Sequence, residues 1–225
     1  MTSFSRQIKA PPRVVATGDG HAAVKHQLID LGREFHARGW SLATSSNYSV
    51  VVGKQPLRLL ITASGKHKDR LGATDFTVVN EHGRACGQEA ARPSAETLLH
   101  TVIADHRGAG AILHTHSIWS TLLSQRHAGP SGEGELILDD FEMLKGLAGI
   151  ESHRAGLRIP IFDNTQDIPS LAAQVQRIFN HPSATPSHAF LLRRHGLYTW
   201  GRDILDAKRH VEALEFLFEV VVREG

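Results

Sequence analysis

Residues 108–116 read GAGAILHTH, an apolar run that ends on two histidines. A continuous apolar run of this length predicts a β-strand. Side chains two residues apart on a strand point to the same face, so His114 and His116 are expected to lie side by side, with Thr115 directed away. Two neutral imidazoles held in this way suit a divalent transition metal such as Zn²⁺, and they suit equally a pair of buried, hydrogen-bonded histidines.

A third histidine, His195, is the candidate that would complete a metal site. It follows the apolar stretch HAFLLRR (188–194) and precedes Gly196, which permits a tight backbone. Three histidines leave at least one coordination position of zinc open, as in catalytic rather than structural sites. His100 and His153 lie in mixed polar surroundings and are expected to be ordinary helix or surface histidines.

Along the chain, helices and strands are expected to alternate before and after this strand, with short connections. Apolar spacing and capping residues predict helices over 22–38, from Ser94 to about 103, and over 118–127, 140–149, 168–179 and 203–222. Strands are predicted after the loop that begins at 41, and over 57–65, 75–80, 83–88, 108–116, 135–138, 157–162, 188–194 and 197–200. Within 157–162, Pro160 suggests an edge or an end of the sheet.

Several of these strand pairs read as hairpins, which favours an antiparallel sheet. The predicted fold class is therefore α/β in the layered α+β sense, with a central, mainly antiparallel β-sheet flanked by helices. We expect one domain over 1–225, with about 1–20 as a flexible N-terminal segment.

The composition restricts the classes of function. The chain has 225 residues, 41% of them hydrophobic, and a formal net charge of +2, with no basic run longer than Arg193-Arg194, so no nucleic-acid partner is indicated. The single cysteine excludes an intramolecular disulfide and fits a reducing compartment. The N-terminus lacks an apolar core and no stretch reaches the roughly 18 apolar residues of a membrane span, so we expect a cytoplasmic protein without a membrane partner.

Two carboxylates and three turns are candidates for the rest of a site. Glu96 and Glu142 each begin a short helix, where a carboxylate either moves protons or simply complements the helix dipole. ATSSNYS (43–49), TASGK (62–66) and RPSAE (92–96) offer hydroxyls and exposed backbone N–H groups of the kind that bind phosphate, or they are plain polar turns.

The ordered motifs SSNYS, TASGK, PSAETLLH, HTHS, FEMLKG and HGLYTWGRDILDAKRHVEALEFLFE resemble the class II aldolase/adducin family. The resemblance covers nearly all of the chain from about residue 22. It implies that one Zn²⁺ per subunit is bound by His114, His116 and His195. It also implies a phosphate site formed by Ser46, Asn47, Ser64, Gly65, Lys66 and Ser94.

Within the family, PSAETLLH, FEMLKG and the last forty residues are most similar to the dehydratases of methionine salvage. This similarity implies zinc-dependent dehydration of 5-methylthioribulose 1-phosphate, with Glu142 as general acid/base. In the related aldolases the acid/base carboxylate matches Glu96, so Glu96 is kept as the second candidate. The alternatives are a sugar-phosphate aldolase or 4-epimerase, and a metal-free adducin-like interaction module.

Two further implications concern assembly and a departure from the family pattern. Relatives are commonly homotetramers with sites near subunit interfaces, so a homo-oligomer is implied here. Ser46 occupies a position where the family usually has glycine, which strains the backbone if its φ is positive.

Overall fold

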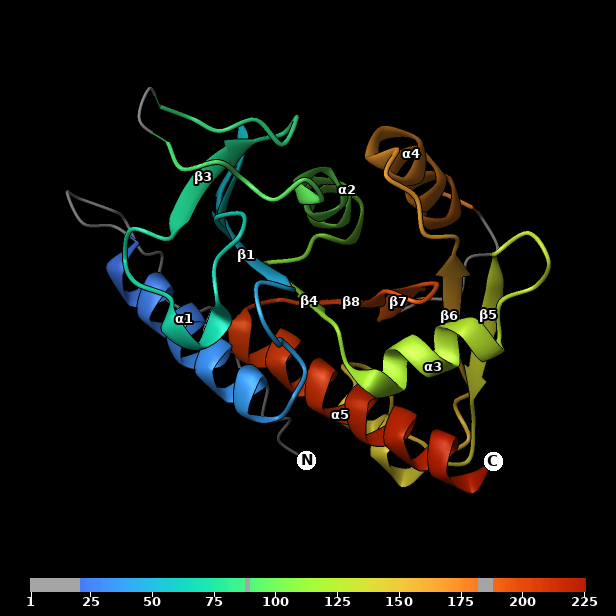
Figure 1. Cartoon of the computed structure of the whole chain (residues 1–225). Helices are drawn as coiled ribbons and strands as arrows, with labels where there is room; N and C mark the ends of the chain where they lie inside the picture. Colours follow the sequence, from blue (N-terminus) through green and yellow to red (C-terminus); the bar gives the residue numbers. More distant parts are fainter. Residues whose placement is uncertain (1–20, 88–89, 182–187) are drawn as a thin grey trace, which may run out of the picture.

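The computed structural model describes residues 21–87, 90–181 and 188–225. In these residues eight strands form one sheet in the order β3-β2-β1-β4-β8-β7-β6-β5 (Figure 1). The strands are β1 (Asn47–Lys54), β2 (Leu57–Thr62), β3 (Phe76–Asn80), β4 (Ala111–Thr115), β5 (Gly134–Leu138), β6 (Leu157–Phe162), β7 (Ala189–Leu192) and β8 (Gly196–Gly201). Neighbouring strands are antiparallel except for the parallel pair β6 and β7, so the predicted, mainly antiparallel sheet is confirmed. The N-terminal segment predicted to be flexible, 1–20, lies outside the described residues.

Helices cover both faces of the sheet. The α-helices are α1 (Ala22–Ala37), α2 (Thr97–Arg107), α3 (Ile118–Arg126), α4 (Ile168–Phe179) and α5 (Ile204–Glu224), and the 3-10 helices are η1 (Lys68–Arg70) and η2 (Glu142–Gly146). Figure 1 shows α2 and α4 on one face and α1, α3 and α5 on the other. Among the described helices, none is long and apolar enough to cross a membrane.

The core follows from this layering. One cluster of buried side chains packs α2 and α4 against the sheet through residues such as Leu99, Val175 and Phe190. On the opposite face α1 packs through Phe35 and α5 through Val211. The apolar spacing seen in the sequence thus corresponds to the buried stripes of these helices.

Three details of the predicted elements are wrong. Residues 83–87 form no strand and contribute only an isolated bridge between Ala85 and Val79. Residues 140–149 contain the short 3-10 helix η2 rather than an α-helix. Pro160 is not on an edge strand, because β6 lies between β7 and β5, but the pairing with β7 begins only at Ile161, after the proline.

Two histidines, one buried (His210) and one partly buried (His188), hold the loop that follows η2. His188 Nε2 donates to the Ala148 carbonyl at 2.6 Å, and Ala148 N–H donates to His210 Nε2 at 3.0 Å. His210 Nδ1 in turn donates to the Trp200 carbonyl at 2.7 Å, so its Nε2 carries the lone pair that Ala148 requires. Burial lowers the pKa of both histidines below the ordinary value, which keeps them neutral.

This pair predicts a loss of stability in acid. In the unfolded chain the histidines regain a pKa near 6.5, so below about pH 6.5 the unfolded state binds more protons than the folded state and the free energy of unfolding falls. For His210 we expect a loss of at most about 1.4 kcal/mol per pH unit below that point. His210→Gln keeps an acceptor for Ala148 but no titration, so urea unfolding between pH 5 and 8 should show a shallower loss. Parallel pH profiles for the two proteins would contradict this assignment.

Candidate active site

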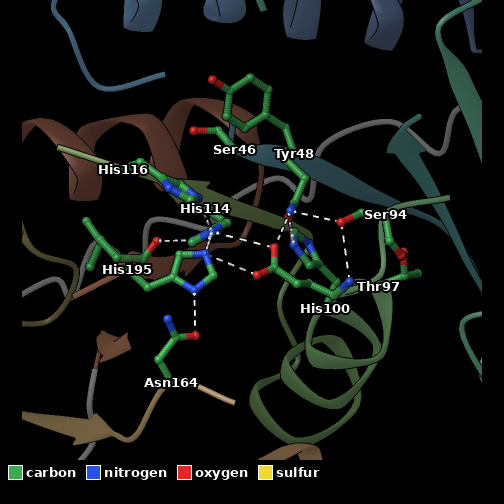
Figure 2. A network of polar contacts seen from close by, with 12 residues as sticks. Ser46, Tyr48, Ser94, Thr97, His100, His114, His116, Asn164 and His195 are labelled. Atoms are coloured by element: carbon green, nitrogen blue, oxygen red, sulfur yellow. Dashed lines mark hydrogen bonds and ion pairs between the residues drawn. The ribbon is translucent and has the colours of Figure 1, made fainter. Parts of the chain in front are cut away.

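Three histidine rings converge where β4 ends and β8 begins (Figure 2). The Nε2 atoms of His114 and His116 are 2.8 Å apart, and those of His114 and His195 are 3.3 Å apart. One ligand atom from each ring lies within 4.8 Å of the others. The two predicted strand-end histidines and the predicted third histidine are therefore brought together.

Hydrogen bonds at Nδ1 fix the orientation of two of these rings, those of His114 and His195. His114 Nδ1 lies 2.9 Å from the Leu197 carbonyl, which only accepts, so this nitrogen carries the proton. His195 Nδ1 lies 3.2 Å from Asn164 Oδ1 in the same arrangement. Their Nε2 atoms therefore point lone pairs at each other, an arrangement that a cation between them would stabilise.

Electrostatics keep the cluster neutral. Burial lowers the pKa of His116 to about 3, with a further contribution from the charges of His195 and Lys68. Burial also lowers the pKa of His114 and of His195, although Glu96 opposes the effect at His195. Neutral imidazole is the form that binds transition metals, so the donor set fits a divalent ion such as zinc.

A glycine makes the close approach of the strands possible. A Cβ atom built on Gly196 would lie 2.0 Å from the Thr115 carbonyl oxygen and 3.3 Å from His114 Cε1. Any side chain here would push β8 away from β4 and separate His195 from His114. The neighbouring Arg194 has a φ of 56°, which completes the tight turn before β8.

Of the two candidate carboxylates, only Glu96 lies against the histidines. Its Oε1 is 3.1 Å from His195 Nε2 and its Oε2 is 3.6 Å from His114 Nε2. Glu96 is also the N-cap residue of α2, rather than the predicted Ser94, although it makes no capping hydrogen bond through its side chain. Ser94 Oγ instead accepts from the Glu96 backbone N–H at 3.3 Å.

Glu142 does not belong to the histidine cluster of its own chain. It begins η2, its side chain is 73% exposed, it forms an ion pair with Lys145, and its Oε2 lies 4.0 Å from His153 Nδ1. It does not line the pocket beside the histidines. The assignment of an acid/base role to Glu142 or to Glu96 stays a prediction.

A pocket of about 170 Å³ opens beside the histidines. Segments of all three predicted anion-binding turns line it, through Ser46, Asn47, Ser64, Gly65 and Ser94 among other residues. Lys66 does not line the pocket, because its ammonium pairs with Asp75 at 2.8 Å.

Three residues at the site were not predicted, or were predicted otherwise. Tyr198 stacks on His114 with ring centroids 4.0 Å apart, and Asn164 orients His195. His100, expected to be an ordinary helix or surface histidine, is fully buried and bonded to Asn47. Tyr198 lies opposite His114 because of the register between β8 and β4. The sequence pattern of a single strand does not determine that register.

Known proteins support this reading of the fold. Residues 26–222 match the family described as Class II Aldolase and Adducin N-terminal domain. A methylthioribulose-1-phosphate dehydratase of Marinobacter nauticus is 46% identical over 200 residues, covering 88% of this chain and 92% of that protein. The enzyme of the same name from Sorangium cellulosum is 45% identical over 206 residues, covering 91% and 93%.

Solved structures agree at the level of the fold. YgbL from Escherichia coli superposes with a TM-score of 0.73 at 21% identity, covering 90% of both chains. The L-fuculose-1-phosphate aldolase of Thermus thermophilus superposes with a TM-score of 0.68 at 23% identity, covering 90% of this chain and 95% of that one. These similarities confirm a class II aldolase-like fold.

The backbone at Ser46 yields a prediction. Its φ is 70°, in the left-handed region, so the strain expected for a serine at this position is present. Ser46→Gly should raise the free energy of unfolding by up to about 1 kcal/mol, since relief of roughly 1–2 kcal/mol exceeds the added freedom of the unfolded chain. Ser46→Val, the matched control, should be less stable than wild type. Denaturant unfolding measures both, and a glycine variant less stable than the valine variant would contradict the argument.

Proposed function

We propose that this chain, which belongs to the family of class II aldolases and adducin N-terminal domains, dehydrates 5-methylthioribulose 1-phosphate to 2,3-diketo-5-methylthiopentyl 1-phosphate. The observation that carries the proposal is the identity of 45–46% with methylthioribulose-1-phosphate dehydratases over most of both chains. The cluster of three neutral histidines beside a polar pocket supports it.

The reaction removes the C3 proton of the substrate and expels the C4 hydroxyl as water, and tautomerisation then gives the diketone. His114, His116 and His195 would hold the metal ion, one Zn²⁺ per subunit in this proposal. When bound, the ion supplies Lewis-acid polarisation of the C2 carbonyl, which makes the neighbouring C3–H more acidic.

The chain's own groups bind and orient the substrate. Hydroxyls of Ser46, Ser64 and Ser94 and the Asn47 amide are at hand for the phosphate oxygens in the pocket. Gly65 has a φ of 72° with open space around it, so its backbone can approach an anion closely. Fixing the phosphate determines which carbons face the histidines.

Proton transfer is assigned to Glu142, with Glu96 as the second candidate. Because Glu142 is exposed and does not line its own chain's pocket, we propose that it serves the site of a neighbouring subunit. The family's homotetramers, with sites near subunit interfaces, would provide that neighbour. A cytoplasmic location is part of the same proposal.

One observation favours a second candidate function. Glu96, the carboxylate that matches the acid/base of the related aldolases, is the one that lies against the histidines. A sugar-phosphate aldolase or 4-epimerase is therefore the alternative. A metal-free, adducin-like interaction module is a third, which metal analysis of the purified protein separates from both enzymes.

Activity on the substrate tests the proposal. Zinc-loaded protein should convert 5-methylthioribulose 1-phosphate to a diketone, detected by absorbance and mass spectrometry. Removal of the metal with a chelator should abolish turnover, and added zinc should restore it. Intact, zinc-loaded protein that leaves the substrate unchanged would rule out the proposed reaction, and release of a triose phosphate from a ketose phosphate would identify an aldolase instead.

Metal binding can be tested independently of turnover. His116→Ala should reduce bound zinc from one ion per chain to less than about a tenth, because two imidazoles hold zinc far more weakly than three. His153→Ala, which alters a half-exposed histidine outside the cluster, is the control and should bind zinc as wild type does. Equal metal content in the two variants would contradict the assigned donor set.

Mixed oligomers test where Glu142 acts. Glu142→Gln and His116→Ala subunits should each be inactive alone. If Glu142 serves a neighbour's site, oligomers reassembled from equal amounts of the two should recover up to about a quarter of wild-type activity, since both intact partners meet at that frequency. No recovery from verified mixed oligomers would contradict the proposal and leave Glu96 as the acid/base.

A further inference from the structure

We infer that His100 is a positioning residue, which acts through Asn47 to orient the Glu96 carboxylate toward the three histidines. His100 lies on α2 and is fully buried, and it is not part of the pocket lining. Its Nε2 bonds to Asn47 Oδ1, and its Nδ1 lies 2.8 Å from Ser49 Oγ. The relevance of these hydrogen bonds to catalysis rests on the proposed function.

The direction of each hydrogen bond follows from the carboxylate end. Asn47 Nδ2 lies 2.8 Å from Glu96 Oε2 and 3.2 Å from Ser94 Oγ. A carboxylate oxygen only accepts, so the amide NH₂ of Asn47 must face Glu96 and its carbonyl oxygen must face His100. That oxygen only accepts as well, so the proton of the imidazole is on Nε2.

The hydrogen bond between Ser49 and His100 Nδ1 is consistent with the Nε2–H tautomer of His100. With the proton on Nε2, Nδ1 carries a lone pair and accepts from the Ser49 hydroxyl. Complete burial lowers the pKa of His100 to about 3, so the ring holds one proton and not two. All donors therefore point the same way, from Ser49 through His100 and Asn47 to Glu96, and bonds aligned in this manner strengthen one another.

Strand pairing places these groups in one row. Asn47 on β1 is opposite His114 on β4, and His114 is opposite Tyr198 on β8. Asn47 and Ser49 are two residues apart on β1 and so share a face, across which α2 places His100. The His100 ring also contacts Tyr198 edge-on, at 5.8 Å between centroids.

The donor on His100 thus holds the carbonyl end of the Asn47 amide, while Glu96 and Ser94 accept from its NH₂ end. Without the donor, Asn47 is held at one end only, and its buried carbonyl oxygen is left without a partner. The side chain then turns to satisfy that oxygen, and Glu96 loses the contact that holds Oε2 while Oε1 faces His195 at 3.1 Å. A carboxylate that turns away from the histidines cannot move a proton or stabilise charge there.

Three variants separate positioning from packing. The amide nitrogen of Gln in His100→Gln can take the place of Nε2, whereas that of Asn in His100→Asn reaches only the place of Nδ1. We expect His100→Gln to keep kcat within about threefold, and His100→Asn to lose about 10- to 100-fold in kcat, the usual range for partners that orient a site residue. Zinc content should stay near wild type in both, and Ser49→Ala should have a smaller effect than His100→Asn.

The outcomes are distinguishable. If kcat falls equally in His100→Gln and His100→Asn, or follows their melting temperatures, His100 only fills space and the inference is wrong. Nitrogen-15 NMR of the wild-type protein gives a readout that needs no activity: the inference requires the Nε2–H tautomer of His100, and the Nδ1–H tautomer would overturn it. Wild-type protein that does not dehydrate the substrate would refute the proposed function, while the NMR experiment would still decide the tautomer.

Discussion

The pairing of β4 with β8 is the constraint on which the site depends. Gly196 allows the two strands to approach until its Cα leaves no room for a side chain against the Thr115 carbonyl. At that separation His114 stacks on Tyr198, and the turn before β8 delivers His195 to the other two rings. His114 is thus held within β4, and His116 and His195 directly flank the paired strands, which position them more rigidly than a long loop would.

Polarity at the site is organised from outside the pocket. The Leu197 carbonyl and Asn164 set the protons of two histidines, and the hydrogen bonds that start at Ser49 set the amide of Asn47. Leu197, Asn164 and Ser49 do not line the pocket, whereas His195 and Asn47, at the other ends of these bonds, border it. The chemical character of the site therefore depends on groups from β1, β8, α2 and the segment after β6.

The sequence predicted the parts of this site that depend on local rules. The two-residue period of a strand places His114 beside His116, and a glycine after His195 signals a tight turn, so the cluster could be foreseen.

Lys66 shows the limit of such reasoning: it follows a small-residue turn that does line the pocket, yet its long side chain reaches Asp75 instead. The burial of His100 could not be predicted because it depends on the tertiary contact of α2 with Asn47 and Ser49 of β1. The pattern at 83–87 follows a turn and predicts a strand, but only one isolated bridge to Val79 forms there.

His114 and His195 are 81 residues apart in the chain, yet their Nε2 atoms lie 3.3 Å apart. No such cluster exists in an unfolded chain, so an ion that requires both nitrogens binds the native state alone. Such an ion stabilises the fold by mass action, by about 2.7 kcal/mol when its free concentration is a hundred times Kd. Metal supply and the population of folded chains are consequently linked quantities, and the apparent melting temperature of this protein becomes a measure of how much metal its surroundings contain.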